Sequence, residues 1–347
     1  MSEPFGTKLT MNLGARSYDI ILKNGALENL YQFARLDRRV AVVTDTGVPA
    51  EYAQRVADQC KEARIITVPQ GEGSKSMKVL ESVLRQMLDF GMGRGDLVIA
   101  VGGGVMGDLA GFAASVYMRG IDFINCPTTT LSMIDSSIGG KTAVDLGDTK
   151  NIVGSFWQPK LVIVDPDTLS TLPRRHYING LAEALKTGIL ADPELFDIFE
   201  NGDIDARINE IIYRSLKFKK NIVEQDETEQ GLRKALNFGH TIGHGIEAVK
   251  GIKGRRTTGF YHGECVALGM LPMIESKALQ KRVRAVYRRL GLPVRTTYDK
   301  EKVLAEMLHD KKAQGGRITV IKVPGLGCWR ADQIPVEGLR TLLGMEA

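Results

Sequence analysis

The chain has 347 residues, 43% of them hydrophobic, and a formal net charge of +5. This length favours two domains and this composition allows a substantial core, so a disordered or fibrous chain is excluded. The charge is small for the size and is not gathered in one long run. This argues against a nucleic-acid groove and remains compatible with a small anionic substrate.

The amino-terminal residues MSEPFGTKLTMNLG contain no apolar run of signal-peptide length. No apolar stretch reaches the roughly 20 residues that cross a bilayer. We therefore expect a cytoplasmic enzyme with no membrane partner. The cysteines lack CxxC spacing, which indicates reduced thiols rather than a disulfide framework or a zinc knuckle. They are Cys60, Cys126, Cys265 and Cys328.

Up to about residue 172, short β-rich runs alternate with helical patterns. The runs are RRVAVVTD, the helix EYAQRVADQCKEA, RIITVP, a helix around KSMKVLESVLRQMLDFG, DLVIAVGGG, and finally LVIVDPD at 161–167. Such alternation is typical of a parallel sheet covered by helices. In the second helix Met77, Leu80, Leu84 and Met87 follow helical spacing, which predicts that all four face the core.

From residue 176 onward the periodicity is helical. It predicts helices near 177–190, 207–225, 235–249, 262–280 and 300–312, a small β element at 316–324, and a surface loop at 250–261. The predicted fold class is therefore a Rossmann-like α/β domain with a parallel sheet (1–173), followed by a mostly α-helical domain (174–347).

The strongest nucleotide signal is VIAVGGGVMGDLAGFAAS. It combines an apolar strand, Gly102, Gly104 and Gly107 in G-x-G-x-x-G spacing, and an amphipathic helix. Glycines let the backbone approach a pyrophosphate, whose charge is stabilised at a helix amino terminus. An ordinary tight βα turn has the same spacing, and here the motif follows two earlier βα units instead of opening the first. Three polar residues near neighbouring strand ends would flank a dinucleotide: Asp45, Glu72 and Lys75.

Three of the five histidines, His240, His244 and His262, lie close together in the sequence. The spacing in NFGHTIGHGIEAV places the first two on one helical face. With Glu183, one carboxylate and two imidazoles suit a catalytic zinc site with an open position. Spacing alone leaves open whether His240 or His244 is the ligand, and a pair of satisfied core histidines is the alternative. The zincin motif is excluded because it needs Glu where this chain has Thr241.

A set of cations could surround such a site, although any one lysine or arginine taken alone is usually solvated surface. The set comprises Arg119, Lys141, Lys150, Lys186, Lys219, Arg233, Lys311 and Lys312. A metal site ringed by cations suits a substrate with phosphate and carboxylate groups.

The sequence context singles out three of these cations. Lys141 directly follows two glycines, and Lys186 lies three residues after Glu183, on the same helical face. Arg233 and Asn237 precede His240 by seven and three residues, so all three share a face if that helix begins early enough.

These residues stand in long blocks that resemble the 3-dehydroquinate synthase family of the sugar-phosphate cyclases, over nearly the whole chain. The blocks are GEGSKS, GGGVMGDLAGFAAS, RGIDFINCPTTTLSMIDSSIGGKTAV, KNIVGSFWQP, NGLAEALKTG, LNFGHTIGHGIEA, HGECVALGM and HDKK. The resemblance implies an NAD-binding α/β domain, a helical domain, one divalent metal (usually zinc, with cobalt possible) and a homodimer. It also implies that Glu183, His240 and His262 bind the metal and that His244 faces the substrate.

The resemblance further implies a lyase of the shikimate pathway, which leads to chorismate and the aromatic amino acids. The substrate would be 3-deoxy-D-arabino-heptulosonate 7-phosphate. Oxidation at C5 by NAD acidifies the C6 proton, phosphate is eliminated, the ketone is reduced again, and ring opening with an aldol closure gives 3-dehydroquinate. Metal would polarise the C5 oxygen.

Individual roles are carried over by matching motif. The substrate would be held by Asp135, Lys141, Asn151, Lys186, Lys219, Arg233, Asn237, His244 and Lys311 or Lys312, with Arg119 reaching in from the partner subunit. NAD would be surrounded by Asp45, Glu72, Lys75, Gly103, Gly104, Val105, Asp108, Thr128, Thr129, Lys150, Thr171, Leu172 and Asn179. Family members commonly have Glu after the TLPRR-type turn, where this chain has His176. A helix cap or cofactor contact at that position is therefore not carried over.

Three rival functions are set against this reading. A sister cyclase would use a different sugar phosphate, and Asn237 and the DKK segment argue against it. A metal-dependent polyol dehydrogenase is disfavoured by the many cations, which suit a phosphate-bearing substrate. A non-catalytic scaffold of the same fold is disfavoured because no metal, phosphate or nucleotide motif is broken.

Overall fold

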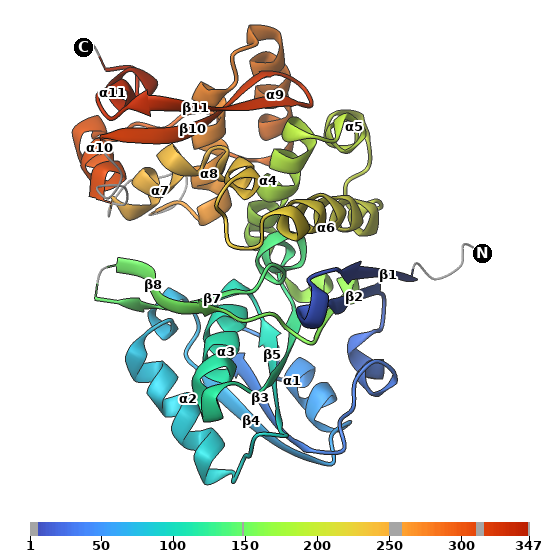
Figure 1. Cartoon of the computed structure of the whole chain (residues 1–347). Helices are drawn as coiled ribbons and strands as arrows, with labels where there is room; N and C mark the ends of the chain where they lie inside the picture. Colours follow the sequence, from blue (N-terminus) through green and yellow to red (C-terminus); the bar gives the residue numbers. More distant parts are fainter. Residues whose placement is uncertain (1–5, 148, 250–258, 310–315, 346–347) are drawn as a thin grey trace. The chain divides into compact units, whose positions relative to one another are not determined.

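The computed structural model describes residues 6–147, 149–249, 259–309 and 316–345, so the loop expected at 250–261 lies almost wholly outside the described residues. The chain divides into two compact units (Figure 1). Unit 1 comprises Met1–Tyr177 and Lys219–Glu224, and unit 2 comprises Ile178–Phe218 and Gln225–Ala347. Among the described residues, no helix combines the length and the apolar character that a membrane span needs.

Unit 1 is built on a seven-stranded sheet with the spatial order β1-β2-β9-β6-β5-β3-β4. All neighbouring strands are parallel except β1 and β2, which pair antiparallel at one edge. The parallel sheet is thus confirmed. The strands are β1 (Gly6–Met11), β2 (Tyr18–Lys23), β3 (Arg39–Asp45), β4 (Glu62–Val68), β5 (Leu97–Gly102), β6 (Asp122–Pro127) and β9 (Leu161–Val164).

Helices cover both faces of this sheet, because alternate side chains of each strand point to opposite faces. On one face Val43 and Val98 pack with α2 (Met77–Asp89) and α3 (Gly104–Val116). On the other face Val42 and Ile99 pack with η2 (Leu27–Gln32) and α1 (Ala50–Ala57). The central strand β5 is buried along its whole length. Its carboxyl end leads into the glycine turn.

Two details of the helices differ from expectation. Leu80 and Met87 are buried, but Met77 is 45% exposed because it is the first residue of α2 and lies beyond the packed face. The helix after the glycine turn is not amphipathic: α3 is buried nearly all round, from Met106 to Ala114. A helix that is apolar on every side belongs to the interior of a domain.

A hairpin not anticipated from the sequence follows β6 in unit 1. Its strands β7 (Lys141–Leu146) and β8 (Thr149–Phe156) pair antiparallel, and β7 packs on α3. A Cβ at Gly111 would lie 2.5 Å from Thr142 Cγ2, so glycine there permits this close packing.

Unit 2 is mostly helical, as expected, and also contains a two-stranded sheet. Several of its helices are broken by short 3-10 turns. The elements are α4 (Arg174–Leu190), α5 (Pro193–Asn201), α6 (Ile208–Gln225), η7 (Leu232–Asn237), α7 (His240–Ala248), α8 (His262–Met270), η8 (Leu271–Met273), α9 (Lys277–Leu290), α10 (Lys300–His309), β10 (Arg317–Gly325), β11 (Cys328–Pro335) and α11 (Gly338–Leu342). α4 begins in unit 1, and part of α6 belongs to that unit.

Two of the expected helices were wrong as continuous elements. The one expected at 235–249 is interrupted at Gly239, whose φ of 80° is left-handed, so α7 begins only at His240. The one expected at 262–280 ends at Met270, before Pro272, and Ser276 then caps the separate helix α9. The β element near 316–324 is confirmed as β10, but its partner β11 was not anticipated.

Candidate active site

The predicted site residues fall into two groups because some belong to unit 1 and others to unit 2. Unit 1 holds Asp45, Glu72, Lys75, Gly103, Gly104, Val105, Asp108, Arg119, Thr128, Thr129, Asp135, Lys141, Lys150, Asn151, Thr171, Leu172 and Lys219. Unit 2 holds Asn179, Glu183, Lys186, Arg233, Asn237, His240, His244 and His262. Lys311 and Lys312 lie outside the described residues.

The glycine turn joins β5 to the amino terminus of α3. Gly103 is the N-cap and supplies no side-chain cap, so the first backbone N–H groups remain available to an anion. A Cβ at Gly104 would lie 2.9 Å from Ser136 Oγ, and one at Gly107 would lie 2.9 Å from Asn125 Nδ2 of β6. Glycine at these positions lets the helix begin close against the sheet, as in dinucleotide-binding turns.

Other predicted cofactor residues lie at neighbouring strand ends. Asp45 ends β3, and Thr128 follows β6 with its N–H donated to Gly102 O at 2.8 Å. Thr171 ends η6 (Pro166–Thr171), where its Oγ1 lies 2.9 Å from the Tyr52 hydroxyl. Thr171 and Tyr52 also line a cavity of about 220 Å³. These residues occupy the edge of the sheet at which open α/β folds bind ligands.

Lys75 connects three predicted residues of unit 1. Its buried ammonium lies 2.7 Å from Asp108 Oδ2 and 3.6 Å from Glu72 Oε1, and it donates a hydrogen bond to Asn151 Oδ1. Burial lowers the pKa of Lys75, but the Asp108 and Glu72 carboxylates outweigh this and raise it above its ordinary value. The ammonium is therefore a fixed positive charge beside the amino terminus of α3. Asn151 is a non-glycine residue held at a φ of 54°.

A second ion pair of unit 1 joins Asp135 and Lys219. Asp135 lies in a π-helical turn, η5 (Ser132–Ser136), a form that is frequent at functional sites. Lys219 Nζ lies 2.9 Å from Asp135 Oδ1 and donates to its backbone oxygen at 2.8 Å. Lys141 and Lys150 are exposed on the β7–β8 hairpin. Arg119 is exposed after α3 and has no hydrogen bond or ion pair among the described residues.

In unit 2, three helices bring the predicted metal ligands together through glycine contacts. A Cβ at Gly269 of α8 would lie 2.0 Å from Gly239 O, which precedes α7. A Cβ at Gly263, the residue after His262, would lie 1.9 Å from Asn179 O of α4. The absence of side chains at these positions lets α8 approach both other helices. His240 and His262 thereby reach Glu183.

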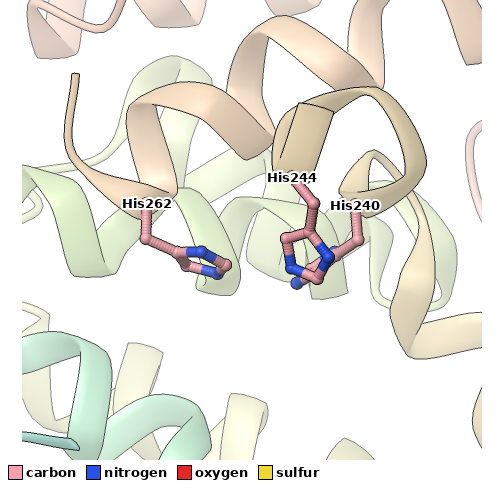
Figure 2. A group of neighbouring side chains, drawn as sticks. All are labelled: His240, His244 and His262. Carbon is pink, nitrogen blue, oxygen red and sulfur yellow. The ribbon is translucent and has the colours of Figure 1, made fainter. Parts of the chain in front are cut away.

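The imidazoles of His240, His244 and His262 point to the same side of their helices (Figure 2). His240 Nε2 and His262 Nε2 each lie 3.5 Å from Glu183 Oε1. Atoms bound to one tetrahedral zinc at its usual bond lengths lie about 3.3–3.6 Å apart. Both distances to Glu183 Oε1 therefore match the spacing between ligand atoms of a tetrahedral zinc site.

The Glu183 carboxylate provides the test of whether a metal fits. It is 2% exposed, and it contacts the Lys186 ammonium, but neither oxygen accepts a hydrogen bond from the described residues. Buried carboxylates are normally hydrogen-bonded or bind a metal, because their desolvation is costly. A divalent ion beside His240 and His262 would satisfy this carboxylate.

The geometry also admits a second ligand set. Ring nitrogens of His240, His244 and His262 all lie within 4.8 Å of one another. His244 is the exposed member of this trio, whereas Glu183 is buried. Both sets share His240 and His262, and the set with Glu183 gives this buried carboxylate a second partner besides Lys186.

The protonation of these groups follows from burial and charge. Burial, helped by Lys186, lowers the pKa of His240 well below its ordinary value, which leaves the neutral imidazole that a metal requires. Burial raises the pKa of Glu183, but Lys186 and His240 outweigh it and lower this pKa well below its usual range. Burial lowers the pKa of His262, but Glu183 and Glu247 outweigh it and raise this pKa to about 10.

The predicted substrate residues of unit 2 surround this cluster only in part. Lys186 Nζ donates to Leu236 O at 2.9 Å, in the turn that contains Asn237. Arg233 is buried and donates to Glu227 O. Because the chain turns at Gly239, Arg233 and Asn237 do not share a helical face with His240, so that expectation was wrong.

Three contacts of this unit were not anticipated. Asn237 Nδ2 donates to Glu229 Oε1 at 2.8 Å, and no sequence pattern marks Glu229. Glu247 Oε2 lies 2.9 Å from His262 Nδ1. Its spacing of seven residues from His240 could have indicated a shared helical face. Asn179, expected beside the cofactor, accepts the Gly263 N–H at 2.7 Å.

Substitution of Gly263 tests the close approach of α8 to α4. We expect Gly263→Ala to lower the free energy of unfolding by about 1–3 kcal/mol, because the new methyl group would overlap the Asn179 backbone. Urea unfolding measures this loss. Gly325→Ala is the matched control in unit 2, since a Cβ there meets nothing within 4 Å. Equal stability of Gly263→Ala and the control would contradict the packing described.

Two family models match adjoining parts of the chain, and curated proteins resemble it over nearly its full length. Residues 65–179 match the model described as 3-dehydroquinate synthase N-terminal, and residues 180–313 match 3-dehydroquinate synthase C-terminal. The chain is 38% identical to a 3-dehydroquinate synthase of Pelobacter propionicus, covering 97% of this chain and 99% of that protein.

Two solved structures share the fold. A 2-deoxy-scyllo-inosose synthase complexed with carbaglucose-6-phosphate, NAD+ and Co2+ has a TM-score of 0.86 at 23% identity, over 97% of this chain and 99% of that one. A 2-epi-5-epi-valiolone synthase from Streptomyces hygroscopicus with NAD+ and Zn2+ bound has a TM-score of 0.82 at 28% identity, over 94% and 95%. With the family models and the curated relative, these findings show that the chain belongs to the 3-dehydroquinate synthase family.

Proposed function

We propose that this protein converts 3-deoxy-D-arabino-heptulosonate 7-phosphate into 3-dehydroquinate and phosphate, as an NAD- and divalent-metal-dependent lyase of the shikimate pathway. The observation that carries the proposal is the convergence of the buried Glu183 carboxylate with His240 and His262. It occurs in a chain that is 38% identical to a curated 3-dehydroquinate synthase over nearly its full length. The domain division after residue 173 and the cytoplasmic location belong to the same proposal.

The metal would be held by Glu183, His240 and His262, which leaves a fourth position for the substrate. Zinc or cobalt is supported by the related cyclases, whose structures contain Zn2+ or Co2+ with NAD+. When bound, the ion supplies a Lewis acid that polarises the C5 oxygen. His244 remains outside this set, and its exposed imidazole is suited to contact the substrate and to carry a proton.

The cofactor would be held at the glycine turn of unit 1. Bound NAD would supply a reversible hydride acceptor for C5, and the ketone at C5 would acidify the C6 proton, so that phosphate could leave before the hydride returns. The uncapped start of α3 suits the pyrophosphate. Lys75 and Asp108 fix each other beside that turn, so the polar groups there are already oriented before the cofactor binds.

The cations would bind the two anionic ends of the substrate and would not react themselves. Lys186 is oriented by Glu183 and Leu236 O, and Lys219 by Asp135. Lys186 keeps a donor that is not used in these contacts, because Lys carries three. Held in this way, the cations would align the substrate and stabilise the leaving phosphate.

Phosphate release tests the proposed reaction directly. The purified protein with zinc and NAD should release phosphate from the heptulosonate phosphate and form 3-dehydroquinate, but should release none from glucose 6-phosphate. Release from another sugar phosphate alone would indicate a sister cyclase. Binding of NAD and zinc with no turnover of any such substrate would indicate a non-catalytic scaffold.

We also propose that the protein is a homodimer whose contact lies around Arg119. Val116 and Met118, which flank the end of α3, are each 42% exposed although they are large and apolar. Arg119 beside them has no hydrogen bond or ion pair among the described residues. A second copy of the chain would cover the apolar pair and could receive the arginine in its substrate site.

Charge placed on this surface should dissociate the dimer. We expect Val116→Glu to sediment as a monomer at concentrations at which the unsubstituted protein is dimeric, because burial of an unpaired carboxylate is costly. Tyr31→Glu is the control, since Tyr31 is 59% exposed on η2. The proposed contact is wrong if Tyr31→Glu dissociates the protein and Val116→Glu does not.

A further inference from the structure

A carboxylate of α7 contacts the ring of His262 on the side away from Glu183. Glu247 Oε2 lies 2.9 Å from His262 Nδ1, whereas His262 Nε2 lies 3.5 Å from Glu183 Oε1. The side chains of Glu247 and His262 are 20% and 28% exposed. The two nitrogens of this imidazole therefore have different neighbours. Nδ1 lies beside the Glu247 carboxylate, and Nε2 faces the predicted metal position.

We propose that Glu247 is the positioning residue of the metal site: it accepts a hydrogen bond from Nδ1–H of His262 and thereby directs the Nε2 lone pair to the metal. The proposal rests on the metal site of the proposed function. A neutral imidazole has one donor nitrogen and one acceptor nitrogen, and an ionised carboxylate can only accept. When a metal displaces the proton from Nε2, the hydrogen bond to Glu247 therefore keeps the remaining proton on Nδ1 and leaves the Nε2 lone pair to the metal.

His240 obtains the same tautomer from a weaker partner. Its Nδ1 lies 3.2 Å from the Phe238 backbone oxygen, which is also only an acceptor. This contact is longer than the Glu247 contact and carries no charge. Both imidazoles thus present Nε2 to Glu183, but only His262 has a charged partner.

The position of His262 gives a reason for this difference. His262 is the first residue of α8, and a helix amino terminus carries a partial positive charge. That charge opposes a divalent ion bound to the same imidazole. A carboxylate at Nδ1 offsets the helix charge and makes the ring a better ligand. His240 also begins a helix, but its side chain is only 14% exposed, against 28% for His262.

The geometry of α7 places Glu247 for this role. His240, His244 and Glu247 are spaced by four and three residues, so they line one face of the helix. The close approach of α7 and α8 at Gly243, where a Cβ would lie 3.1 Å from Cys265 O, sets this face against His262. Asn179 holds the backbone next to His262 through the Gly263 N–H. The ring is fixed by Glu247 and the backbone by Asn179.

Zinc affinity measures the effect of Glu247 without relying on activity. Metal-free full-length protein should be titrated against a chromophoric chelator at one pH, for the unsubstituted protein, Glu247→Ala and Glu247→Gln. We expect Glu247→Ala to bind zinc about 10–100-fold more weakly. Glu247→Gln should lose less, because its amide oxygen can still accept from Nδ1–H. Glu275→Ala is the control, since Glu275 pairs with Arg330 on the surface.

The hydrogen bond at Nδ1 of His262 gives a second measurement. This measurement would not change if Glu247 had only a structural role. With five histidines in the chain, ¹⁵N-histidine spectra of the zinc-bound protein can be assigned from the through-space contacts of each ring. His262 should show a protonated Nδ1 in the unsubstituted protein and in Glu247→Gln. In Glu247→Ala the Nδ1 proton remains while zinc is bound at Nε2, but it should lose its acceptor, so that its resonance moves upfield and exchanges faster with solvent. Circular dichroism verifies that this variant is folded. If Glu247→Ala does not fold, the test relies on Glu247→Gln, which should bind zinc more weakly than the Glu275→Ala control.

Two results would contradict the role of Glu247. The first leaves the proposed metal site intact, and the second rules out the metal site as well. If folded Glu247→Ala binds zinc as tightly as the control and its Nδ1–H resonance is unchanged, Glu247 does not position the ligand, although the metal site stands. The same conclusion follows if Glu247→Ala does not fold and Glu247→Gln binds zinc as tightly as the control. If the unsubstituted protein binds no zinc, the metal site fails, and the proposed function and this role fail with it.

Discussion

His240→Ala and His262→Ala are each expected to be purified without metal and to lose activity by more than about 100-fold, whereas His244→Ala should keep its metal. A site with three protein ligands has no spare one, and its ligands matter more than the surrounding residues, whose loss costs about 10–100-fold. His240 and His262 both face Glu183, while His244 is the exposed member of the trio. His244→Ala should lower turnover by about 10²–10⁴-fold if it carries a proton.

Metal analysis by mass spectrometry decides this assignment. Circular dichroism of the three variants controls for folding, since His240 and His262 each begin a helix. If His244→Ala is the metal-free variant and His240→Ala retains about one ion per subunit, the ligand set containing Glu183 is wrong. Glu183 would then need another explanation for its buried carboxylate.

Mixed dimers of Arg119→Ala and Lys141→Ala subunits are expected to recover activity that both parent proteins lack. A guanidinium can bind a phosphate bidentately, a contact worth about 1.5–3 kcal/mol as a charge-assisted hydrogen bond and poorly replaced by lysine. If Arg119 serves the partner subunit, one site of the mixed dimer carries both defects and the other carries neither. Activity should therefore reach at most about half that of the unsubstituted dimer, given two-fold symmetry.

The mixed dimers must be isolated, for example with two different affinity tags, before activity is measured. Reassociated parent homodimers are the control for the mixing procedure. Verified mixed dimers with no more activity than their parents would mean that Arg119 serves its own subunit or only the fold. The shared site would then be dropped, while the metal and cofactor groups would be unaffected.

The sequence predicted the parallel sheet because buried parallel strands are continuous apolar runs, such as β5 and β9. It did not predict β2 or β6, although both strands are largely buried. It also did not predict β1, β7, β8 or β11, whose burial patterns are largely exposed or mixed. Such strands are stabilised by hairpin pairing rather than by an apolar run. Their existence depends on a partner that the local pattern does not reveal.

Helix boundaries failed where backbone geometry overrides periodicity. The pattern through 235–249 is helical, but Gly239 has a left-handed φ that interrupts the helix, and Met270 and the Val266 backbone leave no room for a side chain there. Only the packed structure shows this constraint. The consequence reaches the site, because the turn separates Arg233 and Asn237 from the face of His240.

The candidate site was predictable in composition but not in geometry. Motifs named Glu183, His240 and His262, yet they come from three helices whose approach depends on Gly239, Gly263 and Gly269. Helical spacing could not decide between His240 and His244, and the burial of Glu183 supplies the argument that spacing lacked. Roles of single residues in binding substrate or NAD stay predictions.

The number of turnovers per NAD tests the central claim most directly. The protein should be loaded with zinc and a limiting, known amount of NAD, and product should be measured together with absorbance of NADH. If C5 is oxidised and reduced again within each cycle, product should exceed NAD many-fold with no lasting NADH. One NADH formed for each product molecule would contradict the synthase reaction and would instead indicate a metal-dependent polyol dehydrogenase.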